Sequence, residues 1–317
     1  MESMISGMFL VDKPKGITSH DVVARIRKAG NFSRVGHGGT LDPMATGILP
    51  VFVGKSTRLS EMLHAWNKTY KFEVTFGITT DTGDAEGAVL SRSEIVEIDS
   101  ERIENILPCF RGRLLQKPPM YSAIKRDGVP LHILARKGIE VERKPREIEI
   151  LELKLLKVEG SKAWFSAHCS KGTYIRTLAQ DIGEALGVGG HVSVLGRSGY
   201  GRFSLEDKKT VSLETLLESL RSESFHTFLI TPDEIFRELP EIRVFDAHLA
   251  GVFRGAILAG FQVYHAGGLF NFSETVRICD RKGKFLALGQ GLVSSSDLDV
   301  QPKGLPVARV EKVVGAQ

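Results

Sequence analysis

Hydrophobic residues recur along this chain with the spacings of both strands and helices. Every second residue is apolar between Tyr70 and Phe76, which predicts a strand whose Tyr70 is either core or the polar end of an apolar face. Between Ile175 and Leu186 the apolar positions recur every three or four residues, which predicts an amphipathic helix that ends at Gly187. The same patterns predict strands at 7–11, 48–53, 148–158, 163–169 and 191–203, and helices at 19–29, 59–66 and 213–220.

The pattern changes near residue 235, which predicts two domains. The stretch from Thr231 to Pro240 is interpreted as a linker. Beyond it, the apolar segments 276–278 and 285–288 flank a polar turn and predict a hairpin in a small β-rich unit. We therefore expect an α+β fold, with a mixed sheet and flanking helices over residues 1–235 and a small β-barrel over residues 241–317.

Composition limits the possible classes of protein. With 317 residues, of which 42% are hydrophobic, the chain can bury a sizeable core. Its three cysteines form no Cys-x-x-Cys pair and its nine histidines fall at no metal-ligand spacing, so we expect no metal site and no disulfide framework. Residues 1–6 lack the basic start of a signal peptide, and no apolar run is long enough for a membrane span. A reducing, cytoplasmic compartment is the expected location.

Positive charge is concentrated in one segment. Between Arg111 and Arg146 ten basic residues face three acidic ones, a net charge of +7 in a chain whose total is +4. Such a run is usually a solvated surface. Because apolar residues such as Met120, Tyr121 and Leu131 are interspersed with it, the segment is also able to form a small basic lobe that follows a phosphate backbone.

A glycine-rich stretch from Arg34 to Gly47 is the strongest candidate for a site. Glycines without a Cβ let another molecule approach the backbone closely, and this stretch presents Asp42 five residues after His37. The alternative is a simple connector in which Asp42 caps a turn before Pro43.

Five segments, in this order, resemble the motifs of the TruB family. They are the run Gly7 to Gly16, the run Gly36 to Gly47 with Thr40-Leu41-Asp42-Pro43, the triplet Lys68-Thr69-Tyr70, the run Gly172 to Thr177 and the run His191 to Leu195. The match covers residues 7 to 205 and includes Pro119-Met120-Tyr121-Ser122-Ala123 at the start of the basic lobe. The tail is similar, more faintly, to a PUA domain.

This resemblance implies an isomerase that converts uridine 55 in the T loop of transfer RNA to pseudouridine. The reaction breaks the bond from N1 to C1′, rotates the base and rejoins it through C5, so it needs a carboxylate and no redox cofactor. The resemblance makes Asp42 that carboxylate and Arg176 the cation that keeps it ionised. Three routes remain open for Asp42, namely attack on the ribose, attack on the uracil, and removal of the C2′ proton.

The base must leave the stack before Asp42 can reach it. By resemblance, His37 is the candidate that stabilises the gap, Tyr70 packs on the flipped base, and Tyr174 and Leu195 are walls of the pocket. Lys13 is expected to contact a phosphate, and Lys125 and Arg126 are expected to clamp the T arm. The family often has Leu-Arg-Arg where this chain has Leu195-Gly196-Arg197, so one basic contact is expected to be missing.

The expected partner is transfer RNA, bound by a monomer without an obligatory protein partner. Two alternatives share the same features. One is a related synthase that depends on a guide RNA and partner proteins, although no long lysine-rich tail is visible. The other is an RNA-binding or chaperone protein without catalysis, which the basic lobe and the PUA-like tail would support.

Overall fold

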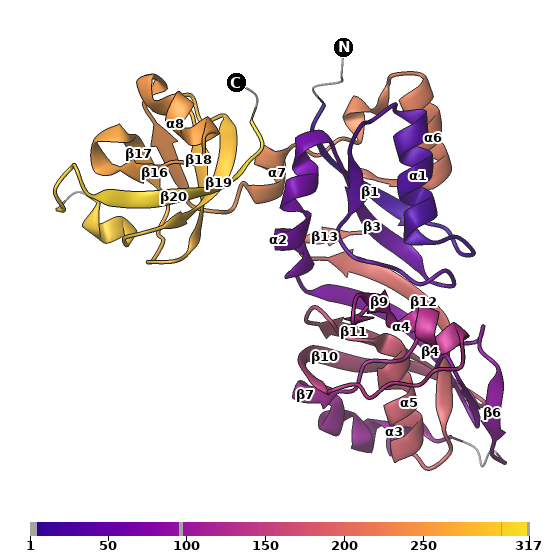
Figure 1. Ribbon diagram of the computed structural model, residues 1–317. Coiled ribbons are helices and arrows are strands. Elements are labelled where there is room, and N and C mark those ends of the chain that lie inside the picture. Colours follow the sequence, from indigo (N-terminus) through magenta and orange to yellow (C-terminus); the bar gives the residue numbers. More distant parts are fainter. Residues whose placement is uncertain (1–4, 95–97, 299, 316–317) are drawn as a thin grey trace.

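Two β-sheets organise the computed structural model, which describes residues 5–94, 98–298 and 300–315 (Figure 1). A ten-stranded mixed sheet runs through the first part of the chain, and a six-stranded sheet forms the C-terminal unit. Figure 1 shows the C-terminal unit beside α2 (Ser60–His64), with α7 (Pro232–Phe236) between the two sheets. The first four residues, on which part of the signal-peptide expectation rests, lie outside the described ranges.

The strands of the large sheet follow the order β14-β1-β3-β12-β4-β11-β10-β7, with β2 paired to β3 and β13 to β12. Their bounds are β14 (Thr210–Ser212), β1 (Gly7–Lys13), β3 (Thr46–Val53), β12 (Gly190–Tyr200), β4 (Lys68–Phe76), β11 (Lys162–Cys169), β10 (Arg146–Glu159), β7 (Gly112–Gln116), β2 (Val35–His37) and β13 (Phe203–Ser204). In the middle of this order, β12 pairs in parallel with β3 and antiparallel with β4. The strand at residues 190–200 therefore lies between two strands from a distant part of the sequence, residues 46–53 and 68–76.

Helices cover the apolar side chains of this sheet. Figure 1 shows α1 (Ser19–Ala29) and α6 (Leu213–Arg221) side by side against β1, and α3 (Ser100–Ile106) and α5 (Ile175–Ala185) at the other end. Thr18 caps α1, because its hydroxyl accepts a hydrogen bond from the Asp21 amide and the Asp21 carboxylate accepts one from the Thr18 amide. The short elements in between are η1 (Gly54–Leu59), β5 (Ile78–Thr80), β6 (Val89–Arg92), η2 (Leu107–Phe110) and η3 (Phe225–Thr227).

The basic lobe is smaller than predicted. Its first part is β7, which pairs with β10 in the large sheet, so Arg111 and Arg113 belong to that sheet and its border. The remainder, residues 117–145, contains β8 (Lys125–Arg126), β9 (Val129–Pro130) and α4 (Leu131–Arg136). These are two-stranded and single-turn elements whose side chains are mostly exposed, and the lobe therefore projects from the sheet without a core of its own.

The stretch from Thr231 to Pro240 is not a free linker. Residues 232–236 form α7, which Thr231 caps, and Ile235 and Phe236 are buried against Phe285 and Val314 of the C-terminal unit. The threonine cap and the proline at the first turn favour a helix start, a signal that the linker interpretation missed. The two units therefore share one apolar cluster.

The C-terminal unit is a curled sheet with strand order β16-β20-β19-β18-β15-β17. Its elements are β15 (Glu241–Val244), η4 (Asp246–His248), α8 (Leu249–Phe253), β16 (Ile257–Ala259), η5 (Gly260–Gln262), β17 (Val263–Gly267), β18 (Thr275–Cys279), β19 (Phe285–Gly291), η6 (Ser295–Asp297) and β20 (Pro306–Val313). The predicted hairpin is confirmed as β18 and β19, and a separate apolar cluster lies within the unit.

The expected α+β class is confirmed, and each predicted strand and helix has a counterpart close to its predicted bounds. The alternation in β4 is confirmed too, since Phe72, Val74 and Phe76 are fully buried on one face and Tyr70 is half-buried at its end. None of the helices in the described ranges is long and apolar enough to span a membrane.

Candidate active site

Asp42 lies on a loop that connects β2 to β3 and has little space for side chains. A Cβ at Gly38 would come within 3.1 Å of the Phe52 ring, and one at Gly47 would come within 2.2 Å of the Arg197 carbonyl oxygen, where φ is also +101°. Close packing and the positive φ therefore require glycine at position 47, and at position 38 any side chain would have to displace the Phe52 ring slightly. At Gly36 a Cβ would meet no atom closer than 4.0 Å, so close packing inside the protein does not require glycine there.

Several buried side chains hold the backbone of this loop. The Ser19 hydroxyl accepts a hydrogen bond from the Leu41 amide at 2.8 Å and donates one to the Leu41 carbonyl at 3.0 Å. Arg197 donates to the carbonyls of Ile48 and Gly39 at 2.7 and 3.0 Å. The residue before Asp42 is thus held on both of its backbone polar groups, which fixes where the carboxylate starts.

Lys13 belongs to this support, which corrects the expectation of a phosphate contact. Its side chain is fully buried, and its ammonium donates to the carbonyls of Pro14, Ile17 and Pro43. Burial lowers the pKa of this amine to about 8. Three backbone acceptors satisfy all three of its protons, so no donor remains for RNA.

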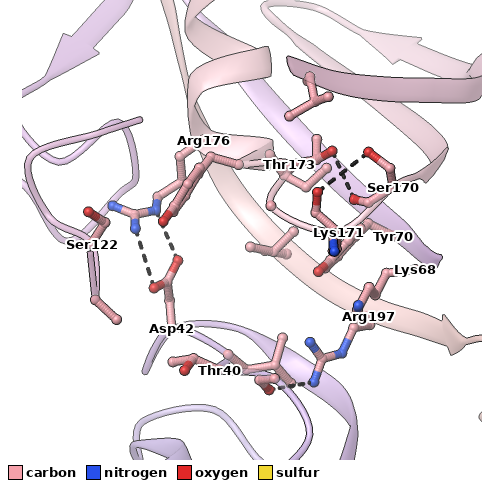
Figure 2. Close-up of a pocket in the computed structure, with 18 of the residues that line it drawn as sticks. Thr40, Asp42, Lys68, Tyr70, Ser122, Ser170, Lys171, Thr173, Arg176 and Arg197 are labelled. Atoms are coloured by element: carbon pink, nitrogen blue, oxygen red, sulfur yellow. Dashed lines mark hydrogen bonds and ion pairs between the residues drawn. The ribbon is translucent and has the colours of Figure 1, made fainter. Parts of the chain in front are cut away.

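Asp42 forms a two-point ion pair with Arg176, the second residue of α5 (Figure 2). Nε of Arg176 lies 2.9 Å from one carboxylate oxygen and its terminal nitrogen lies 3.3 Å from the other. The Arg176 side chain is 5% exposed, whereas the Asp42 side chain is 34% exposed. Asp42 is therefore oriented from behind while one side stays open to a ligand.

Opposing effects act on the pKa of the Asp42 carboxylate. Burial raises the pKa of Asp42, the Arg176 guanidinium lowers it, and the nearby Asp84 carboxylate raises it again. RNA phosphates near the site would add to the raising effect. The ion pair is therefore what favours an ionised, reactive carboxylate in this environment.

Arg176 also connects Asp42 to two segments that the sequence reasoning did not associate with it. Its guanidinium donates to the carbonyl of Tyr121 in the basic lobe at 2.7 Å and to the carbonyl of Thr82 at 2.8 Å. Asp84, in the turn that follows β5, lies 3.7 Å from the same guanidinium and is buried. Backbone carbonyls carry no sequence signal, so only the fold could reveal these contacts.

A cavity of about 540 Å³ opens in front of this pair. That volume lies in the range of small-molecule binding sites. The cavity brings together Tyr70, Tyr174 and Leu195 with Asp42 and Arg176. Its further lining residues include Thr40, His64, Lys68, Tyr121, Ser122, Arg146, Glu147, Ser170, Lys171, Thr173 and Arg197. Burial raises the pKa of the Tyr70 hydroxyl, which therefore stays protonated at neutral pH.

His37 lies on β2 and is not part of the cavity lining. Its Nδ1 accepts a hydrogen bond from the Gly39 amide at 3.3 Å. Burial lowers the pKa of His37 to about 4, with smaller contributions from nearby cationic side chains including Arg197. Its imidazole is consequently neutral at neutral pH. Because Nδ1 already accepts, the ring can stack there or donate a hydrogen bond through Nε2–H, but as a neutral imidazole it is not a general acid.

Lys125 and Arg126 are exposed on the β8–β9 ribbon, outside the cavity lining. Arg126 donates to the Glu142 carbonyl at 3.0 Å and approaches Asp127 at 3.9 Å. Exposed pairs of this kind are weak, so both cations can exchange these partners for phosphates.

The glycine at position 196 leaves the lining of the cavity unchanged. On β12, Leu195 and Arg197 lie opposite Phe72 and Tyr70, on the cavity and core face, whereas Gly196 lies opposite the exposed Lys71. A side chain at position 196 would therefore point to the other face of the sheet. The missing basic residue that the sequence comparison suggested does not belong to the wall of this site.

The sequence analysis did not predict that Lys68 and Lys171 line the cavity. One signal could have indicated them, because each lies at the edge of a motif of the family. Lys68 is buried and donates to the His64 carbonyl at 2.8 Å, and burial lowers its pKa to about 8.

In the described part of the chain, no group of three or more His, Cys, Asp or Glu residues could hold a metal ion.

Two family models match most of the large sheet. The model of the TruB family pseudouridylate synthase N-terminal domain matches residues 27–175, and that of the tRNA pseudouridylate synthase B C-terminal domain matches residues 176–234. A tRNA pseudouridine synthase B of Stutzerimonas stutzeri is 40% identical over 305 residues, 95% of each chain. One of Aromatoleum aromaticum is 43% identical over 288 residues, 90% of this chain and 89% of that protein.

Solved structures resemble the whole chain as well. The protein of an H/ACA ribonucleoprotein bound to a substrate RNA containing 2′-deoxyuridine covers 98% of this chain and 85% of its own, with a TM-score of 0.77 and 28% identity. A Cbf5-Nop10-Gar1 complex gives a TM-score of 0.76 and 30% identity over the same shares.

Proposed function

The chain belongs to the TruB family as an enzyme that isomerises uridine to pseudouridine in transfer RNA, and we propose that it acts at position 55 of the T loop with Asp42 as the catalytic carboxylate. The observation that carries this assignment is the partly exposed Asp42–Arg176 pair in a cavity that is also lined by three tyrosines, Tyr70, Tyr121 and Tyr174. Such a carboxylate is held in place yet accessible to one base.

In this proposal Arg176 keeps Asp42 ionised and oriented, while Asp42 reacts with the ribose, with the uracil or with the C2′ proton. Tyr70 packs against the flipped base, and Tyr174 and Leu195 close the sides of the pocket. His37, on the approach strand, stabilises the gap that the base leaves in the RNA. A neutral imidazole suits that stacking role.

The decisive experiment uses the purified chain and unmodified transfer RNA without other factors. Pseudouridine at the T-loop position is expected only if the chain acts alone. The fold is shared with H/ACA proteins, so dependence on a guide RNA is the alternative that the assay must separate. No product alone but product after adding guide RNA and partners would favour that alternative, and binding without any product would favour a chaperone. We further propose a monomer in the cytoplasm, without an obligatory protein partner.

We propose that the basic lobe clamps the backbone of the T arm through Lys125 and Arg126. Replacing both with Ala should weaken binding and reduce the slope of log affinity against log salt, by about 0.7–0.9 for each phosphate that is no longer neutralised. Binding titrations at several salt concentrations measure this slope. A slope equal to that of the unaltered chain would mean that these side chains are only a solvated surface.

We propose that residues 241–317 form a PUA-like unit that grips another part of the transfer RNA. A chain that ends at Leu239 should convert a T-arm hairpin but bind whole transfer RNA more weakly. In this shortened chain Ile235 and Phe236 no longer pack against Phe285 and Val314. We therefore also expect the free energy of unfolding of the shortened chain to be lower by about 2–3 kcal/mol. Equal affinity of both chains for transfer RNA would contradict the binding role, and failure to fold would contradict the proposed boundary.

A further inference from the structure

Two exposed cations that line the Asp42 cavity have neither a carboxylate partner nor a backbone acceptor in the part of the chain that the structure describes. Arg176 pairs with Asp42, and Lys68 and Arg197 are buried and donate to backbone carbonyls. Lys171 and Arg146, in contrast, are exposed and take part in no ion pair there. Figure 2 shows Lys171 among the side chains drawn around the pocket.

Both cations come from backbone segments that one buried side chain ties together. Gln116 lies opposite Arg146 in the β7–β10 ladder. Its amide side chain accepts a hydrogen bond from the Tyr174 amide at 2.8 Å and donates one to the Tyr174 carbonyl at 3.1 Å. Gln116 is 5% exposed, so this pair of hydrogen bonds is shielded from water.

The turn that carries Lys171 is also held at its other end. The Ser170 amide donates to the Glu149 carbonyl and the Ser170 hydroxyl accepts from the Glu149 amide, both at 2.8 Å. Thr173 closes the turn with a bond to the Ser170 carbonyl at 3.0 Å. The two cations are therefore presented from a rigid frame, while their flexible ends stay free to follow a ligand.

We propose that Lys171 and Arg146 form a subsite for the RNA phosphates that flank the flipped uridine. The inference rests on the proposed function, because a flipped nucleotide brings its own phosphates to the mouth of the cavity that receives its base. Each flanking phosphate is an anion that loses part of its solvation there, and an unpaired cation compensates for that loss. This subsite lies in the catalytic cavity and is separate from Lys125 and Arg126 in the lobe.

Glu147 provides an internal test of this assignment, because it is an exposed carboxylate that lines the same cavity beside Arg146. A carboxylate at this position repels phosphate. Replacing Glu147 with Gln should therefore tighten RNA binding, opposite in sign to the loss of a cation.

The experiment measures the affinity of a T-arm hairpin RNA for the full chain at several salt concentrations. Lys171→Gln and Arg146→Gln should each weaken binding about five- to tenfold near 0.1 M salt and lower the slope of log affinity against log salt by about 0.7–0.9. Lys208→Gln is the matched control, because Lys208 is exposed, takes part in no ion pair among the described residues and lies outside the cavity. Glu147→Gln should bind more tightly than the unaltered chain.

If Lys171→Gln and Arg146→Gln match Lys208→Gln in slope and affinity, the subsite is wrong. Pseudouridine formation by the unaltered chain would in that case leave the proposed function standing. Loss of affinity with an unchanged slope would also overturn the proposal, because it would indicate a structural effect. Circular dichroism of each variant during unfolding identifies any variant that fails to fold. If one of the two cation variants fails to fold, the other tests the subsite.

Discussion

Replacing Asp42 with Asn should lower pseudouridine formation by at least about 10²–10⁴-fold, the size of a positioned acid–base or nucleophilic contribution. The amide keeps the shape of the carboxylate but loses its negative charge, its basicity and its nucleophilicity. RNA affinity should be largely retained, since Asp42 contributes negative charge near the phosphates. Single-turnover assays with saturating enzyme measure the chemical step separately from binding.

Asp84→Asn is the matched control for this experiment. Asp84 lies 3.7 Å from the same guanidinium, but it is buried in a turn and is not part of the cavity lining. Its loss should reduce the rate much less than the loss of Asp42. A rate for Asp42→Asn within tenfold of the unaltered enzyme would overturn the assignment of Asp42.

Replacing Arg176 with Ala should lower the rate by about 10²-fold or more. The substitution removes both bonds to Asp42 and leaves the carbonyls of Tyr121 and Thr82 without their donor. Breaking a buried ion pair typically costs about 3–5 kcal/mol, and solvent screens part of this cost because Asp42 is 34% exposed. A lysine at this position would keep one charge without the two-point geometry, so Arg176→Lys should rescue only part of the rate.

The pH dependence of Arg176→Ala has a defined sign. Burial raises the pKa of Asp42 and Arg176 opposes this rise, so removing Arg176 raises the pKa further. Because the ionised carboxylate is the active form, activity should be lost at a higher pH than in the unaltered enzyme as the solution is acidified. A pH–rate profile of kcat measures this shift, and profiles that coincide would show that the two residues are not coupled.

Local sequence was sufficient wherever a side chain meets neighbours close in the chain. The alternation in 70–76 determined which face of β4 is buried, since side chains of a strand point alternately to opposite faces. Thr18 and Asp21 determined where α1 begins, because both partners of the cap lie within one turn. The motif order similarly indicated Asp42, Tyr70 and Arg176 as members of one site.

Only the tertiary structure decided how that site is held and which charges are free in it. Asp42 and Arg176 are 134 residues apart, and the guanidinium is positioned by carbonyls of Tyr121 and Thr82, which any residue type could provide. The sequence suggests that Lys13 is a surface cation, yet it is buried and its ammonium donates to three backbone carbonyls. Lys171 in contrast stays exposed at the cavity. Whether a cation binds backbone or RNA depends on which acceptors the folded chain places around it, and the sequence alone carries no record of those distances.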